Sequence, residues 1–216
     1  YDSLSIYAVN LIKEFLKPKI PKKNKIIVLP GGKSPSKLFA NLKLKNFNWS
    51  GITILLSDER LVKPDDINSN YALVTEIFSN KENIPQIFPD MRGFKKGNEN
   101  IFLDEMNTKF EKMPKISLSF LGVGEDGHTA SIFPNKTIIS SKKTPYFLTK
   151  KEDESFYRIS LSEKYILMSE KIVFLITGQN KKEILGKIGN EDNSIPFNRI
   201  INNSKQEIIC LTDIQK

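Results

Sequence analysis

The most informative part of the sequence is the stretch Phe120-Leu121-Gly122-Val123-Gly124-Glu125-Asp126-Gly127-His128-Thr129-Ala130-Ser131. It continues an apolar run that begins at Ile116, and a short apolar run of this kind is typical of a buried strand. The loop that follows contains three glycines, which mark the end of a regular element. Glycine permits backbone conformations that a β-carbon forbids, and it lets a ligand approach the main chain closely. We therefore expect a buried strand that ends in a ligand-binding loop.

His128 is the only histidine among the 216 residues, and Asp126 precedes it with one small residue between them. An unperturbed imidazole has a pKa near neutrality, so any proton transfer through an imidazole in this chain must use His128. The alternative is a histidine with a structural role on a surface loop. The position at the end of a buried strand, among glycines and close to an aspartate, favours a functional role.

The composition is typical of a soluble globular protein, and we expect residues 1–216 to form a single domain. No apolar run approaches the roughly 20 residues that are needed to span a bilayer. The first ten residues lack the pattern of a signal peptide. The single cysteine, Cys210, cannot form an intrachain disulfide, and a zinc site is not expected. We therefore expect a cytoplasmic protein that uses no metal.

The net charge of +8 comes mostly from scattered lysines. Scattered charges of this kind indicate a solvated surface, so we expect no nucleic-acid partner and no membrane partner. A positive field favours the capture of a small anionic substrate, which is the partner that we predict. For the assembly we expect a monomer or a weak homodimer.

Apolar patterning predicts strands that alternate with helices along the whole chain. Such alternation indicates an α/β fold with a mostly parallel sheet and helices on both faces. Residues 137–155 are polar, and we expect them to form an irregular excursion. Helices are expected over residues 3–17, 71–78, 100–113, 164–168 and 182–188, and strands over 26–29, 52–56, 116–121, 156–161, 172–176 and 208–211.

The strand over residues 26–29 ends in Pro30-Gly31-Gly32-Lys33-Ser34-Pro35-Ser36, which has the pattern of a tight turn into a helix. Exposed amides at a helix N-terminus form an anion site, to which Lys33 and Ser34 can add donors. The alternative is a tight connection without a ligand. The strand over residues 172–176 likewise ends in a glycine and cations, Gly178-Gln179-Asn180-Lys181.

The strand over residues 52–56 ends in Ser57-Asp58-Glu59-Arg60. Charged residues at the carboxyl end of a buried strand indicate a site, because open α/β sheets bind ligands there. Arg60 can hold a phosphate or a carboxylate through two hydrogen bonds. The alternative is a structural ion pair between Arg60 and either Asp58 or Glu59.

Taken together, these segments resemble the 6-phosphogluconolactonase family over residues 26–182. The family pattern combines a Gly-Gly loop, a D-E-R-x-V…S-N-Y segment, a G-x-G-x-D-G-H-T-A-S-x-F-P motif, an R-[IL]-[ST]-L segment and a late G…K. This chain departs from the pattern at Pro30, where the family has serine, and at Lys33-Ser34, where it has Ser-Thr. The matching segments are Pro30–Pro35, Asp58–Val62, Ser69-Asn70-Tyr71, Gly122–Pro134, Arg158–Leu161 and Gly178–Lys181.

The resemblance implies a Rossmann-like sheet of the sugar-phosphate isomerase/deaminase type. It also implies cofactor-free hydrolysis of 6-phospho-D-glucono-1,5-lactone to 6-phosphogluconate in the oxidative pentose phosphate pathway. The catalytic residues that we predict on this basis are His128, Asp126 and Arg60. The predicted substrate-binding residues are Gly31, Gly32, Lys33, Ser34, Asp58, Asn70, Gly124, Gly127, Thr129, Arg158 and Lys181.

Two other functions remain open from the sequence. One is an enzyme like the glucosamine-6-phosphate deaminases, which share the D-G-H core but continue it differently. The other is a sugar-phosphate binding module without catalysis. The continuation through Ser131-Ile132-Phe133-Pro134 favours the lactonase, and the presence of both His128 and Arg60 argues against the binding module. A serine nucleophile of the G-x-S-x-G type is absent from the sequence.

Overall fold

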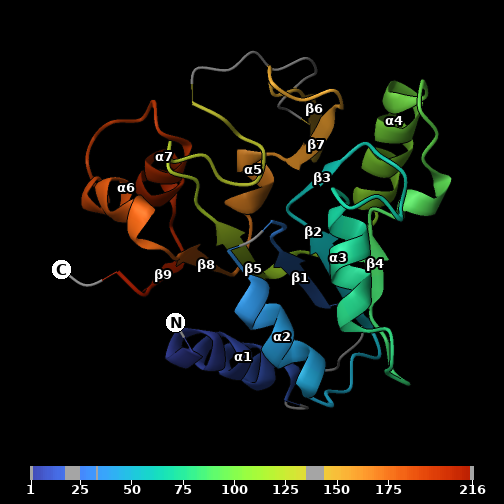
Figure 1. Cartoon of the computed structure of the whole chain (residues 1–216), viewed down its shortest axis with the longest axis horizontal. Coiled ribbons are helices and arrows are strands. Elements are labelled where there is room, and N and C mark those ends of the chain that lie inside the picture. Colours follow the sequence, from blue (N-terminus) through green and yellow to red (C-terminus); the bar gives the residue numbers. More distant parts are fainter. Residues whose placement is uncertain (1, 18–24, 33, 135–143, 215–216) are drawn as a thin grey trace.

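The computed structural model describes residues 2–17, 25–32, 34–134 and 144–214. Figure 1 shows a central sheet between helices on one side and, on the other, further helices and a small second sheet. The helices are α1 (Asp2–Leu16), α2 (Ser36–Leu44), α3 (Asn70–Ile77), α4 (Glu99–Phe110), α5 (Glu163–Ile166), α6 (Lys182–Gly186) and α7 (Pro196–Asn203), with 3₁₀ turns η1 (Met91–Gly93) and η2 (Gln179–Lys181). The strands are β1 (Lys25–Leu29), β2 (Ile52–Leu56), β3 (Asp58–Arg60), β4 (Gln86–Phe88), β5 (Ile116–Gly122), β6 (Tyr146–Thr149), β7 (Arg158–Leu161), β8 (Lys171–Ile176) and β9 (Glu207–Thr212).

The central sheet has six strands in the order β4-β2-β1-β5-β8-β9, and every neighbouring pair is parallel. The chain builds from β1 through β2 to β4 at one edge, and then returns to β5 on the other side of β1. The direction of building therefore reverses between β1 and β5. Open α/β sheets bind ligands outside the carboxyl ends of the strands at such a reversal. The mostly parallel sheet with helices on both faces is confirmed.

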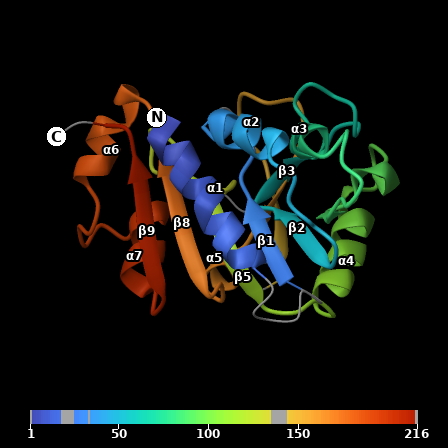
Figure 2. The ribbon, with the colours of Figure 1, turned by 90° about the horizontal axis from the view of Figure 1, so that it is seen from below.

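Both faces of the sheet are covered, so its central strands are mostly apolar. On β1, Ile26 and Val28 belong to one hydrophobic cluster, whereas Ile27 and Leu29 belong to the other. This division follows from the alternation of side chains along a strand. Helices α1, α2 and α3 cover the second cluster, and α4, α5 and α7 contribute to the first. Figure 2 shows α1 in front of the strands on that second side.

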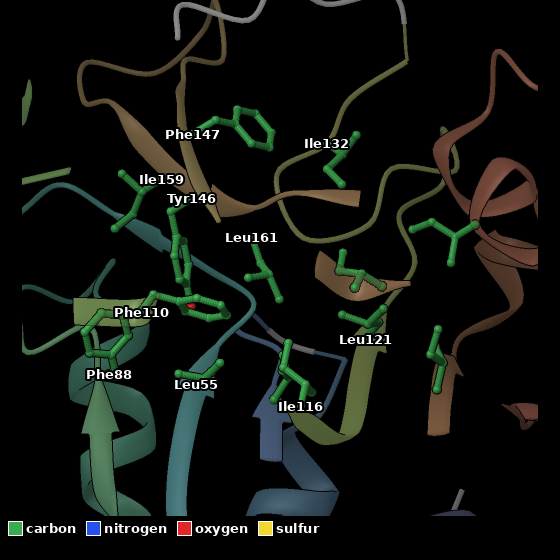
Figure 3. Packing of buried hydrophobic residues seen from close by; sticks show 14 of the residues in the cluster. Leu55, Phe88, Phe110, Ile116, Leu121, Ile132, Tyr146, Phe147, Ile159 and Leu161 are labelled. Atoms are coloured by element: carbon green, nitrogen blue, oxygen red, sulfur yellow. The ribbon is translucent and has the colours of Figure 1, made fainter. Parts of the chain in front are cut away.

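The second sheet has three antiparallel strands in the order β3-β7-β6. The irregular excursion expected over residues 137–155 is wrong for β6, which is a buried strand. All four of its residues are buried, so it shows no alternation, and it is too short for its apolar run to stand out. Figure 3 shows Tyr146 and Phe147 of β6 in the first hydrophobic cluster.

Other differences from the expected elements are small. Strand β4 has only three residues and was not expected, because so short a segment carries no readable period. The helix expected over 100–113 ends earlier, at Phe110. None of the helices in the described ranges combines the length and the apolar character that crossing a bilayer requires.

Asn107 on α4 hydrogen-bonds the backbone of β6 as a residue of a neighbouring strand would. Its side-chain amide donates to the carbonyl oxygen of Tyr146 at 3.0 Å and accepts from the Tyr146 N–H at 2.8 Å. In Asn107→Ala the Tyr146 N–H loses the Asn107 acceptor, whereas the Tyr146 carbonyl keeps the Thr144 hydroxyl, which donates to it at 2.7 Å. We therefore expect the free energy of unfolding to fall by about 1–3 kcal/mol. Urea denaturation followed by circular dichroism measures this change. An unchanged midpoint would contradict it.

Candidate active site

A cavity of about 220 Å³ opens at the reversal between β1 and β5. It is lined by the loop after β1, by β3 and the residue before it, by the loop after β5, by β7 and by η2. These segments are far apart in the sequence and meet because the parallel strands end at the same edge of the sheet. The lining residues are Pro30, Gly31, Gly32, Ser34, Ser57, Asp58, Arg60, Gly122, Val123, Gly124, His128, Ala130, Arg158 and Lys181.

His128 and Asp126 form a hydrogen-bonded pair in the loop after β5. The imidazole Nδ1 lies 2.5 Å from Asp126 Oδ1, and the same oxygen also accepts from the His128 N–H at 3.1 Å. Burial opposes ionisation of Asp126, but the hydrogen bonds and charge of His128 outweigh it and lower the pKa of this carboxyl. The ionised carboxylate accepts the proton on Nδ1, which leaves the lone pair of Nε2 available as a base. The half-buried imidazole lines the cavity, whereas Asp126 stands behind it.

The histidine loop is anchored to the rest of the fold by hydrogen bonds. The Gly124 N–H donates to the His128 carbonyl at 2.8 Å, and the Thr129 hydroxyl donates to the Gly122 carbonyl at 2.9 Å. The Phe197 N–H of α7 donates to the Gly127 carbonyl at 3.1 Å. Thr129 is fully buried, and neither Thr129 nor Gly127 lines the cavity. These two predicted substrate contacts hold the loop in place.

Two glycines in this loop leave no room for a side chain. A β-carbon on Gly124 would lie 2.1 Å from His128 Nδ1 and 2.8 Å from Asp126 Oδ1. Gly127 has a φ of +77°, and a β-carbon there would lie 2.4 Å from a methyl group of Ile195. The missing side chain of Gly124 therefore leaves the space that the imidazole occupies, and Gly127 allows the loop to pack against the rest of the fold.

A buried polar network holds the wall formed by β3 and β7. Asp58 Oδ2 accepts from the Ser131 hydroxyl at 2.6 Å and lies 3.4 Å from Arg158 Nη1. The other nitrogens of the Arg158 guanidinium donate to Glu154, with Nε 2.6 Å from Oε2. Arg158 is thus paired with two carboxylates, although it lines the cavity.

Arg60 and Lys181 are the cavity cations that lack an ion pair within the described ranges. Arg60 Nη1 donates to the Asn68 carbonyl at 2.8 Å, and its Nε is buried without a hydrogen-bond partner. The expected alternative, an ion pair of Arg60 with Asp58 or Glu59, is not present among the ion pairs of the described residues. Lys181 is 9% exposed, its Nζ donates to the Ser34 hydroxyl at 2.8 Å, and burial lowers its pKa.

Gly31 and Gly32, two of the predicted substrate contacts, line the cavity, and Asn70 stands behind them. A β-carbon on Gly31 would lie 2.0 Å from the side chain of Asn70, which also donates to the Asp58 carbonyl at 2.9 Å. Asn70 therefore supports the wall of the cavity without lining it. Lys33, another predicted contact, lies outside the described residues.

Some features of the site carry no signal in the sequence. Ala130 lines the cavity with a φ of +51°, in the left-handed region that costs an alanine about 1–2 kcal/mol. The contacts of Ser131 with Asp58 and of Glu154 with Arg158 depend on the placement of β3 and β7. In the part of the chain that the structure describes, no three His, Cys, Asp or Glu side chains lie together as metal ligands would.

Comparison with known proteins adds an independent observation. Residues 2–210 match the family of glucosamine-6-phosphate isomerases and 6-phosphogluconolactonases. The chain is 30% identical over 202 residues to the 6-phosphogluconolactonase of Helicobacter pylori, a match that covers 91% of this chain and 88% of that protein. The identity to the 6-phosphogluconolactonase of Haemophilus influenzae is 30% over 172 residues, covering 75% of this chain and 72% of that one. The crystal structure of a 6-phosphogluconolactonase from Shewanella baltica superposes with a TM-score of 0.84 at 25% identity, covering 97% of this chain and 93% of that chain.

Proposed function

The chain belongs to the family of glucosamine-6-phosphate isomerases and 6-phosphogluconolactonases, and we propose that its cavity hydrolyses 6-phospho-D-glucono-1,5-lactone with His128 as the general base. The family resemblance predicted from the motifs is confirmed. The enzyme is a 6-phosphogluconolactonase, a hydrolase of the oxidative pentose phosphate pathway. The observation that carries the proposed mechanism is the His128–Asp126 pair in a cavity that also holds Arg60 and Lys181, which have no ion pair with any residue that the structure describes.

In the proposed mechanism, Nε2 of His128 takes a proton from a water molecule while the water oxygen attacks C1 of the lactone. The carbonyl π electrons move onto the carbonyl oxygen, and a tetrahedral intermediate forms. When the intermediate collapses, the bond between C1 and the ring oxygen breaks, and the imidazolium returns its proton to that oxygen. Asp126 stabilises the imidazolium and keeps the proton on Nδ1, as an orienting carboxylate does.

The developing oxyanion needs donors that are already oriented before the reaction begins. Backbone amides of the glycine loop after β5 and the Arg60 guanidinium are the candidates for this role. Arg60 is held by Asn68 and has no carboxylate within ion-pair distance among the described residues, so its charge remains available to a substrate.

We assign the phosphate of the substrate to the side of the cavity formed by Gly31, Gly32, Ser34 and Lys181. Backbone amides of a glycine turn before a helix suit a phosphate, and Lys181 adds a charge that is already directed toward this turn. Arg158 is a weaker candidate because Glu154 and Asp58 already neutralise it.

Lys181→Met is expected to raise KM for the phosphorylated lactone by about tenfold to a hundredfold, because a charge-assisted hydrogen bond to the phosphate is lost. Turnover at saturating substrate should change little, since Lys181 does not take part in the chemical steps. Initial rates over a range of substrate concentrations measure both constants. Lys182→Met is the matched control, since it removes the same charge from the exposed neighbouring residue. An equal effect in both variants would contradict the assignment.

The direct test of the function is the hydrolysis of freshly generated 6-phosphogluconolactone, with the product coupled to its dehydrogenase. The lactone also opens spontaneously in water, so the rate must be compared with a reaction without enzyme. Acceleration well above this background is the expected result. Conversion of glucosamine 6-phosphate without acceleration of lactone hydrolysis would instead indicate the deaminase activity of the same family.

A further inference from the structure

We propose that Glu59, which does not line the cavity, is a positioning residue that fixes Arg60 by locking β3 onto the N-terminus of α3. This inference rests on the proposed function, because it concerns Arg60, the guanidinium that we propose as a donor to the oxyanion. Glu59 lies between two cavity residues, Asp58 and Arg60, in a strand of three residues. Since side chains alternate along a strand, Glu59 points away from the cavity.

The Glu59 carboxylate is fully buried and accepts four hydrogen bonds. Oε1 accepts from the Arg60 N–H at 2.6 Å and from the Asn70 N–H at 2.8 Å. Oε2 accepts from the Tyr71 N–H and from the Ser69 hydroxyl, the latter at 3.2 Å. Three of these donors belong to the first turn of α3 or to its N-cap, where amides have no partner within the helix. One carboxylate thus joins β3 to α3.

Both ends of Arg60 are tied to the same turn. Its N–H is held by the carboxylate that caps α3, and its guanidinium donates to the carbonyl of Asn68, two residues before the helix. The turn is itself fixed against the cavity, because the side chain of Asn70 fills the space beside Gly31 and donates to the Asp58 carbonyl. Glu59 therefore connects Arg60 to a rigid part of the cavity wall.

The charge of Glu59 has no ion-pair partner among the residues that the structure describes. Burial raises the pKa of this carboxyl to about 7, although hydrogen bonds from the backbone of Asn70, Arg60 and Tyr71 oppose the rise. The N-terminus of α3 stabilises a negative charge through the helix dipole. A neutral amide of the same shape cannot replace the carboxylate, because both oxygens of Glu59 face donors and a glutamine offers only one acceptor oxygen.

The test is a double-mutant cycle with Glu59→Gln, Arg60→Ala and the double variant, measured as kcat and KM for the phosphorylated lactone. If Glu59 acts through Arg60, Glu59→Gln lowers kcat/KM by about tenfold to a hundredfold in the wild-type background. In the Arg60→Ala background the same substitution should change kcat/KM by less than about threefold. The change in kcat and the change in KM should also stand in the same proportion in Glu59→Gln as in Arg60→Ala.

Independent effects that multiply in the double variant would overturn the role of Glu59, because residues that act separately contribute additively in free energy. Asn107→Ala is the control for general destabilisation, since it also removes buried hydrogen bonds but lies away from the cavity, and it should keep kcat and KM. If Glu59→Gln does not fold, Ser69→Ala is the milder variant. It removes one donor to Glu59 and should show the same dependence on Arg60 with a smaller effect.

The outcome also separates this inference from the proposed function. A wild-type enzyme that does not accelerate lactone hydrolysis refutes the function, and with it the role of Glu59. A wild-type enzyme with strong acceleration, combined with multiplicative losses in the cycle, refutes only the positioning role.

Discussion

His128→Ala is expected to lower kcat for lactone hydrolysis by about 10² to 10⁴, with a much smaller change in KM. The reason is that removal of a general base typically costs this much in rate, whereas the imidazole contributes little to binding of the ground state. His128 is the only imidazole in the chain, so no other histidine can take over the proton transfer. The measurement is the coupled assay at saturating substrate, corrected for spontaneous opening of the lactone.

Two controls make this result specific to proton transfer. Thermal denaturation of His128→Ala should show a folded protein, because the side chain is half-buried on a surface loop. Added imidazole should restore part of the turnover in the variant but leave the wild type unchanged. Near-normal turnover in His128→Ala would rule out the general-base role while leaving the lactonase activity in place.

Gly124→Ala is expected to lower kcat by about 10²-fold, although it adds only one methyl group. That β-carbon would lie 2.1 Å from His128 Nδ1 and 2.2 Å from its Cε1, so the imidazole must move. A displacement of about 1 Å of a catalytic group can cost 10²-fold in rate. Gly124 does not have a positive φ, so alanine fits its backbone, and the effect is expected to come from the displaced ring.

The matched control is Gly186→Ala in α6, where a β-carbon meets no heavy atom within 4 Å. We expect this variant to keep full activity and, if anything, to be slightly more stable, since alanine favours a helix more than glycine does. The comparison uses the same assay for both variants. Full activity in Gly124→Ala would mean that the loop shifts to accept the methyl group without moving the imidazole.

The parts of the site that the sequence predicted are those encoded locally. The glycine loop with His128 and the Gly31-Gly32 turn each directly follow a buried strand, so the parallel sheet brings them together at one edge. The same apolar runs also predicted the mostly parallel main sheet. Thr129 and Gly127, which the motif predicted as substrate contacts, do not line the cavity, because motif membership does not show which loop residues face a cavity and which pack behind it.

The parts that were not predicted depend on how side chains are oriented and on how the short strands are placed in the fold. Arg158 was predicted as a substrate-binding residue, and its ion pairs were not foreseen: the turn before β7 brings Glu154 to it, and β3 brings Asp58. Glu59 was considered as an ion-pair partner of Arg60, yet in a strand of three charged residues no apolar alternation reveals which side chain faces inward. Strand β6 was missed because a short run buried on both sides resembles any other apolar segment.

The anchoring of the histidine loop has a consequence for the thermodynamics of substrate capture. Because Gly122, Gly124, Gly127 and Thr129 fix the loop through hydrogen bonds within the protein, the conformational entropy of ordering it is lost when the chain folds. Substrate then meets a base that is already oriented, and little further ordering of this loop opposes association. The interaction energy with the sugar phosphate can therefore appear as affinity and as correct placement of the lactone carbonyl.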